Sequence, residues 1–432
     1  MADSMSRTRS FIARCMYKFF IDGTLKSYGV ILEKTVEDLN TAHSLIGWSF
    51  SLQIGACYLI SPIAGILAGI LNYQTLGLLG GLIVGTASIG PSLFSSQATW
   101  QLFPTAIMSG CGFGLLNIAT ILSLKNTFDS SYPLVYSTTL LSANLGVSTL
   151  PLLLEYLLRS FNKRIAMAIF GLLTCMLILV GIIIPLETRD IDVDNTKDRS
   201  RDTTNKCKAS EQDDQKERKL LIDENVCKST KQGLLVGHPG ALLLVCLHVV
   251  YDLNYAGWSI FLVPYGVSLG LESATAVWLS TFGGLGGLSG RLFCMFLFYS
   301  GYDGNIYGVA LPTFIVAVGI SLSLISYSFT TLLVTAFLSG FGLAAQASSL
   351  SAMVPSFVCK RHFKSCVVLM YTVGGVMSQL GGIITGFIDD ETCSYRLAFI
   401  LMGTLSVLQC IVAVICSCYN FFSESSKKEC LQ

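Results

Sequence analysis

Long apolar runs separated by short polar breaks extend along most of the chain. Twelve of them have the length of a membrane-crossing helix. They lie at residues 11–32, 45–71, 75–95, 101–124, 134–158, 164–185, 239–267, 275–298, 306–327, 330–357, 365–388 and 395–419. A hydrocarbon core of about 30 Å needs roughly 20 apolar residues per helix, and each helix in it must satisfy its own backbone hydrogen bonds. The pattern therefore predicts an all-α membrane protein with 12 transmembrane helices.

One long polar stretch interrupts this pattern. Between Glu187 and Lys231 the chain carries 12 acidic and 11 basic residues and shows no apolar periodicity. Such a segment is typical of a solvated linker, with a segment regulated by phosphorylation as the alternative. Six predicted spans precede it and six follow it. We therefore predict an N-terminal six-helix half over 1–186, a charged cytosolic linker over 187–238, a C-terminal six-helix half over 239–420 and a cytosolic tail over 421–432.

Short sequence matches recur between the two groups of spans at offsets of 228 to 237 residues. Gly112-Phe113-Gly114-Leu115 matches Gly340-Phe341-Gly342-Leu343, and Arg164-x-Ala-x-x-x-x-Gly171 matches Arg396-x-Ala-x-x-x-x-Gly403. Because each copy contains an even number of spans, the two copies have the same orientation in the membrane. Two parallel halves predict the major facilitator fold, in which a substrate binds near the middle of the membrane and the halves rock around it.

Composition agrees with a membrane protein and excludes several other classes. The chain is 52% hydrophobic and 13% charged, which is outside the usual range of soluble proteins. Its net charge of +1 gives no indication of nucleic-acid binding. The cysteines are scattered mostly through apolar runs, which does not suggest a disulfide framework. No spacing typical of a metal site, a cofactor site or a catalytic constellation occurs within the spans, so we expect neither an enzyme nor a bound metal or cofactor.

Lysine and arginine predict which ends of the spans face the cytosol. Basic residues occur at 7–14 and 360–364, whereas the loops expected on the opposite side are acidic at 33–38 and 389–391. One loop, at 159–164, has the opposite bias. The majority predicts that both termini and the linker are cytosolic.

Two cations inside predicted spans are candidates for binding a substrate anion. Lys26 lies in the first span and Arg291 in the eighth. Charged residues at membrane depth usually face a partner or a water-filled cavity, and a guanidinium matches the geometry of a carboxylate. The alternative is a side chain that extends to the membrane surface. Val263 occupies the position equivalent to Lys26 in the repeat, so the fold itself does not require a cation there.

Other residues in the spans extend this candidate site. Asp22 precedes Lys26 by one helical turn, where the two side chains can pair. Asp22 either holds Lys26 in place or exchanges a proton, and the alternative is a simple charge-neutralising pair. His248 and Asp252, one turn apart in the seventh span, predict a packed hydrogen-bonded pair, with proton handling as the alternative. Phe341 is a candidate for the lining of the central cavity, with aromatic packing as the alternative.

Three segments resemble the monocarboxylate transporter family. They are LKSYGVILEK followed by Ser44–Trp48, VPYGVSLGLESATAVWLSTFGGLGGLSGR, and LGGIITGFIDDETCSYRLAF, in which Gly386, Asp389, Thr392, Tyr395 and Phe399 match the family pattern. The resemblance implies transport of small monocarboxylates such as lactate, pyruvate or ketone bodies, often with a proton, across the plasma membrane. It implies that Lys26 and Arg291 contact the substrate. For some members it also implies a single-span glycoprotein chaperone as partner.

The chain also departs from the family pattern. The opening D-G-G-W-G-W signature is absent, and the first span is shortened and unusually polar. The family's aromatic-Phe and basic cluster before the fifth span is replaced by Asn126–Pro133. Proton-coupled members carry an aspartate four residues before the arginine of the eighth span, where this chain has Gly287. The alternatives are a facilitator of another substrate, such as an aromatic amino acid, a hormone-like acid or a polyol, and a membrane receptor that transports nothing.

Overall fold

The structure, a computed structural model, describes residues 2–93, 99–128, 132–186, 239–300, 307–325, 328–357 and 360–429. The helices before the linker are α1 (Ala2–Leu39), α2 (His43–Leu59), α3 (Ser61–Ile70), α4 (Tyr73–Leu93), α5 (Thr99–Thr127), α6 (Tyr132–Ser160), α7 (Lys163–Thr174) and α8 (Met176–Ile183). Those after it are α11 (Pro239–Ser268), α12 (Ser273–Tyr299), α13 (Tyr307–Ser323), α14 (Phe329–Phe357), α15 (Lys360–Thr392) and α16 (Tyr395–Glu429). The predicted linker lies outside the described residues.

Each predicted span coincides with one helix or with two consecutive helices. The second span is α2 and α3, which meet at an angle of 42°, and Pro62 at the start of α3 lacks the amide hydrogen that would continue the helix. By length and composition, six of the described helices can cross a membrane, or seven if the bent pair counts as one span. The prediction of an all-α, multi-pass membrane protein is confirmed.

The expectation of a shortened first span is wrong. α1 is a continuous helix of 38 residues. Its polar positions are tolerated because they face other helices, and Arg14, Asp22 and Lys26 are all buried. Large apolar side chains such as Ile66 and Leu172 are exposed instead. This distribution, with polar groups inside and apolar groups outside, is the one that hydrocarbon requires.

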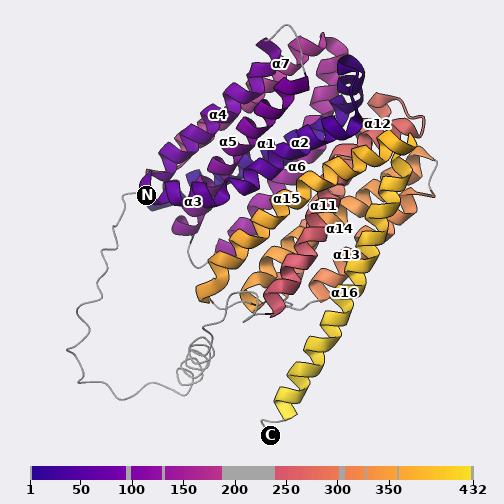
Figure 1. The fold of residues 1–432 in the computed structure, drawn as a ribbon. Helices are drawn as coiled ribbons and strands as arrows, with labels where there is room; N and C mark the ends of the chain where they lie inside the picture. The colour runs from indigo at the N-terminus through magenta and orange to yellow at the C-terminus, as the bar shows by residue number, and fades with distance from the viewer. Residues whose placement is uncertain are drawn as a thin grey trace.

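The two groups of helices form two bundles side by side, the first indigo to magenta and the second red to yellow in Figure 1. Their internal packing repeats, because α1 packs on α6 and α4 on α5, as α11 packs on α15 and α13 on α14. A Cβ atom on Gly146 would overlap the carbonyl oxygen of Phe19, and one on Gly381 would overlap that of Leu253. These two close approaches are separated by the offset of the sequence repeat, and the missing side chain is what permits them.

The halves meet through two reciprocal helix pairs, α2 with α15 and α6 with α12. A Cβ on Gly382 of α15 would lie 2.6 Å from the carbonyl oxygen of Gly47 on α2, and one on Gly284 of α12 would lie 2.8 Å from the backbone nitrogen of Ser148 on α6. Between these pairs α1 of the first half faces α11 of the second. The interface is therefore tightly packed and places the middle of α1 against the middle of α11.

Candidate substrate site

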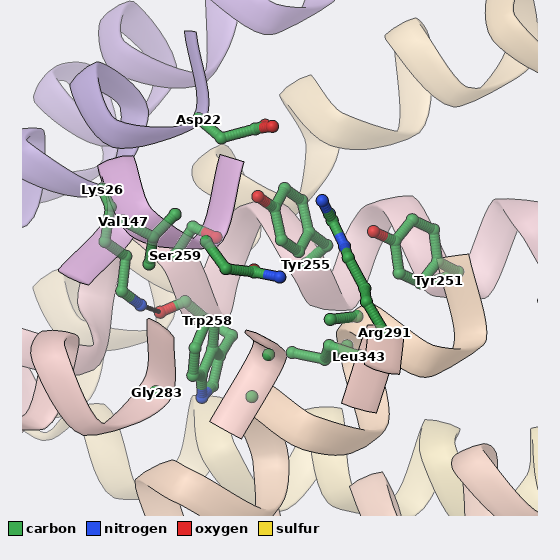
Figure 2. A pocket seen from close by; sticks show the side chains of 14 residues that line it. Asp22, Lys26, Val147, Tyr251, Tyr255, Trp258, Ser259, Gly283, Arg291 and Leu343 are labelled. Carbon is green, nitrogen blue, oxygen red and sulfur yellow. Dashed lines mark hydrogen bonds between the residues drawn. The ribbon is translucent and has the colours of Figure 1, made fainter. Parts of the chain in front are cut away.

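A small pocket lies between the halves, with walls from α1, α6, α11, α12 and α14 (Figure 2). Its lining consists of Asp22, Lys26, Asn144, Val147, Tyr251, Tyr255, Trp258, Ser259, Gly283, Gly287, Arg291, Gly340, Leu343 and Ala344. The space is about 20 Å³, which is enough for a single water molecule. The structure thus has the halves closed on this site, and they must separate before it can hold anything larger than water.

Lys26 is buried on α1, and its ammonium reaches the other half. Nζ donates a hydrogen bond of 3.1 Å to the carbonyl oxygen of Trp258 on α11 and lies 3.4 Å from the centroid of the Trp258 ring, a cation–π contact. The residue is only 1% exposed. The structure therefore excludes the alternative in which Lys26 extends to the membrane surface.

Arg291 of α12 makes a similar contact from the second half to the first. Its Nη1 donates to the carbonyl oxygen of Leu140 on α6, and its Nε has no hydrogen-bonding partner among the described residues. Each half thus supplies one cation, and a backbone carbonyl of the other half accepts its hydrogen bond. A neutral carbonyl is a weaker partner for a cation than a carboxylate.

The predicted pair between Asp22 and Lys26 does not form. The Asp22 carboxylate lies 3.8 Å from Nζ of Lys18 instead, because the Lys26 side chain reaches across to Trp258. Asp22 nevertheless lines the pocket, and in Figure 2 its carboxylate points toward the Tyr255 hydroxyl. The pocket therefore contains one carboxylate besides its two cations.

Phe341 does not line the pocket, contrary to expectation. Its ring packs against Phe293 with the ring centroids 5.7 Å apart, and its neighbours Gly340 and Leu343 face the pocket instead. Residues one position apart point about 100° away from each other on a helix of 3.6 residues per turn. For Phe341 the alternative of aromatic packing is therefore the one that the structure supports.

The aromatic wall of the pocket escaped the sequence analysis. Tyr251, Tyr255 and Trp258 lie on one face of α11, and the first two rings stack with their centroids 5.6 Å apart. The indole Nε1 of Trp258 donates a hydrogen bond of 3.0 Å to Ser339, which fixes the ring that Lys26 contacts. The spacing of these three residues over two helical turns of an apolar span was the signal that could have revealed them.

Gly287 leaves space for a side chain of the facing helix. A Cβ atom at this position would lie 2.6 Å from Oδ1 of Asn144 on α6, and Asn144 is itself buried. An aspartate at 287 would thus require Asn144 to move. In this chain the polar group at this point of the pocket comes from α6, and an asparagine inside the fifth predicted span was the signal for it.

Comparison with known proteins identifies the family. The sequence pattern described as Major Facilitator Superfamily matches residues 15–300. The chain belongs to the Major Facilitator Superfamily. It is 24% identical to monocarboxylate transporter 2 of Meriones unguiculatus over 92% of its own length and 81% of that protein. It is 22% identical to monocarboxylate transporter 12 of Rattus norvegicus over 86% of its own length and 77% of that protein.

Solved structures of other superfamily members have the same fold. The nucleoside transporter NupG aligns with a TM-score of 0.64 at 13% identity and covers 96% of this chain and 99% of its own. The peptide transporter POT, in complex with sulfate, aligns with a TM-score of 0.66 at 13% identity, and the alignment covers 94% of this chain and 93% of its own. These confirm the major facilitator fold, and the sequence relatives confirm the resemblance to monocarboxylate transporters. Homologues and fold together point to a transporter of small molecules, not to an enzyme.

A major facilitator must open its two ends alternately, and a cluster of polar residues closes one end of this chain. This cluster, which lies at the ends of α1, α2, α15 and α16, consists of Glu33, His43, Asp389, Asp390 and Tyr395. The imidazole of His43 lies 3.2 Å from Glu33 in its own half and 3.2 Å from Asp390 in the other half. Asp390 also accepts hydrogen bonds of 2.7 and 2.9 Å from the backbone N–H groups of His43 and Ser44. The aspartate thereby caps α2 from across the interface.

A second contact across the interface involves Arg159, whose position opposed the charge rule. Its guanidinium lies 3.1 Å from Glu155 in the same helix and 3.0 Å from Glu272, which lies between α11 and α12 in the second half. Ser273 also donates a 3.5 Å hydrogen bond to Glu155. The basic residue in this loop is thus engaged by acids of both halves.

The cluster around His43 predicts that the stability of the folded protein depends on pH. The hydrogen bond with Glu33 raises the pKa of His43 from 6.5 to about 8, against the opposing effect of burial and with further help from Asp389 and Asp390. His43 and the two aspartates lie outside the spans predicted at 45–71 and 365–388. Because the pKa is raised in the folded state, protonated His43 stabilises the closed end fully below pH 6.5, and this stabilisation is lost as the pH rises through 8.

We therefore expect the melting temperature of the purified protein to fall as the pH is raised over this interval. His43→Gln should flatten the fall, because glutamine does not titrate. The measurement is a thermal melt in detergent at a series of pH values, with unchanged buffer and salt. An identical pH profile for His43→Gln and the unmodified chain would contradict the role of His43.

Proposed function

We propose that this chain is a secondary transporter of small organic anions, with monocarboxylates such as lactate and pyruvate as the favoured substrates. The observation that carries the proposal is the reciprocal arrangement of Lys26 and Arg291. Each cation comes from one half and is bonded to a carbonyl oxygen of the other. No ion pair among the described residues involves either cation. The sequence similarity to monocarboxylate transporters, although only 22–24% identity, supports the same substrate class.

The arrangement supports a specific link between binding and movement. A carboxylate that accepts hydrogen bonds from both cations replaces the carbonyl oxygens of Trp258 and Leu140. Two direct bonds between the halves are then exchanged for bonds that pass through the substrate. A ligand shifts a conformational equilibrium only as far as it binds the two states differently. An anion therefore alters the contact between the halves, whereas a neutral molecule of the same shape leaves both carbonyl bonds in place.

The test is uptake of labelled lactate into cells that express the chain, compared with its neutral amide. Lactate should enter in proportion to the amount of protein at the surface, the amide should not, and an inward proton gradient should accelerate lactate uptake. The assay is run with and without a co-expressed single-span glycoprotein chaperone. Absence of lactate and pyruvate uptake with the protein at the surface would overturn the proposal.

We further propose that the protein resides in the plasma membrane with both termini in the cytosol. The distribution of basic residues supports this orientation, and the resemblance to the family supports the membrane. An epitope added to either terminus should bind antibody only after the cells are permeabilised. Labelling of intact cells would contradict the orientation.

A second candidate substrate class is an organic acid that carries an aromatic ring. Tyr251, Tyr255 and Trp258 favour it, because they give the pocket an aromatic wall next to the two cations. Aromatic pairs stabilise a complex beyond the area that they bury. If this class is preferred, phenylpyruvate should compete with labelled pyruvate at a lower concentration than unlabelled pyruvate does.

A further inference from the structure

His248 and Asp252 form a buried pair that the candidate substrate site does not use. They lie one turn apart on α11, 7% and 2% exposed, with Nε2 of the imidazole 3.2 Å from Oδ2 of the carboxyl group. This approach is an ion-pair contact without hydrogen-bond geometry, and neither Oδ2 of Asp252 nor Nδ1 of His248 has a hydrogen-bonding partner among the described residues. Buried polar atoms are nearly always hydrogen-bonded. Two orphan atoms on neighbouring titratable groups therefore need an explanation.

No salt bridge among the described residues joins the pair to a third charged side chain. α15 approaches at Gly374, where a Cβ atom would overlap Oδ2 of Asp252, so at this point α15 presents backbone to the carboxyl group. The titratable groups that face the pair are tyrosines: Tyr251 on α11, whose ring is 5.7 Å from the imidazole, and Tyr371 on α15, at 6.5 Å. The ring centroid of Tyr58 on α2 lies 5.3 Å from that of Tyr371. The charges on other packed helices, Asp22 of α1 and Arg291 of α12, act on Tyr251.

The number of protons on the pair decides its net charge. Without a proton the pair carries one negative charge, with two it carries one positive charge, and with one it is neutral whichever residue holds the proton. An uncompensated charge is costly in a dry interior. While the halves are closed on it, the pair therefore favours one bound proton over none or two. A neutral acid beside a neutral imidazole avoids the desolvation of two buried charges, so the proton belongs on Asp252.

We propose that His248 and Asp252 form a proton-binding site that loads and releases one proton in each transport cycle. The proposal rests on the proposed function. The proton comes from water on one side of the membrane and returns to water on the other, and no bond of the substrate is broken. His248 stacks on Tyr251, and Tyr251 lines the pocket, so a single side chain separates the proton site from the substrate site.

The position of the pair explains how movement of the halves exposes it. Tyr371, which contacts His248, also contacts Tyr58 of the other half. When α2 and α15 separate, this tyrosine contact opens and water reaches the pair. Ionisation of Asp252 then no longer carries the cost of a dry environment, and the proton leaves. The site is therefore occupied in the closed arrangement and exchanges its proton when the interface opens.

Infrared spectroscopy of the purified protein tests the proton site without any transported substrate. The unmodified chain should show the carbonyl stretch of a protonated buried carboxyl group, and Asp252→Asn should remove it. The control Glu155→Gln should leave it unchanged, because Glu155 is paired with Arg159. His248→Gln, which also serves if Asp252→Asn does not fold, should shift the pH at which the signal disappears. A signal unaffected by Asp252→Asn, or by His248→Gln, would overturn the site.

Transport by the same variants tests coupling. Asp252→Asn should reduce uptake driven by a proton gradient by about tenfold, within the usual range of coupling between sites. It should leave exchange of labelled for unlabelled substrate at equal pH largely intact, because exchange moves no net proton. Retention of the gradient effect in Asp252→Asn, or loss of exchange together with it, would overturn the coupling role. If the unmodified chain transports no monocarboxylate, the proposed function fails, and the infrared titration still decides whether the proton site exists.

Discussion

Lys26→Gln is expected to reduce uptake of lactate and pyruvate by at least tenfold. Glutamine keeps a hydrogen-bond donor for the carbonyl oxygen of Trp258, on a side chain one bond shorter than that of lysine. It lacks the charge that a substrate carboxylate would meet. A hydrogen bond to a charged group contributes about 1.5–3 kcal/mol, so the initial rate at low substrate concentration should fall by roughly 10- to 150-fold.

The measurement is the initial rate of labelled lactate uptake, normalised to the amount of protein at the cell surface. Lys34→Gln is the matched control, because it removes the same charge from the same helix two turns further along, away from the pocket residues. It should transport at the rate of the unmodified chain. Equal rates for Lys26→Gln and Lys34→Gln would place Lys26 outside the substrate site.

The second large effect concerns the stability of the two bundles. Gly146→Ala adds a Cβ atom that would overlap the carbonyl oxygen of Phe19, so α6 must move away from α1. Gly381→Ala does the same between α15 and α11, against Leu253. Because the obstructing atom is backbone, a side-chain rotation cannot relieve the overlap. Each substitution should lower the free energy of unfolding by about 1–3 kcal/mol.

Gly65→Ala is the matched control for both, because a Cβ atom at this position on α3 has no neighbour within 4 Å. It should raise the stability by up to about 1 kcal/mol, since alanine favours a helix more than glycine does. The readout is the melting temperature of the purified proteins in one detergent. A similar effect of Gly146→Ala and Gly381→Ala is expected from their equivalent places in the repeat. A lowering at only one of the two positions would show that the halves do not share this packing.

Much of the fold could be predicted because each span is dictated by local chemistry. A run of about 20 apolar residues in a bilayer has to be helical, whatever its neighbours are. The repeat then indicated two parallel halves, and matching close approaches at Gly146 and Gly381 agree with it. The first span was misjudged because composition does not show which way a side chain points. Its charged residues weakened the apolar signal, although Arg14, Asp22 and Lys26 all face other helices.

The candidate site could be predicted only in part. Lys26 and Arg291 were found because an isolated charge in an apolar run stands out, and both line the pocket. The pairing of Asp22 was wrong because spacing along one helix was the sole guide, whereas Lys26 found a partner on another helix. Phe341 was misplaced because aromatic residues pack as readily against a neighbouring helix as into a cavity.

The sequence by itself thus determined the number and type of the spans, the two-fold repeat and the two candidate cations, Lys26 in the first half and Arg291 in the second, because hydrophobic length and isolated charge are properties of single segments. Only the tertiary structure decided what each cation contacts, which face of α11 forms the pocket wall, and that His248 and Asp252 pair behind this wall. These features depend on the packing of helices more than a hundred residues apart in sequence. Their relative rotation is set by close approaches at small residues, which the order of residues along one helix does not reveal.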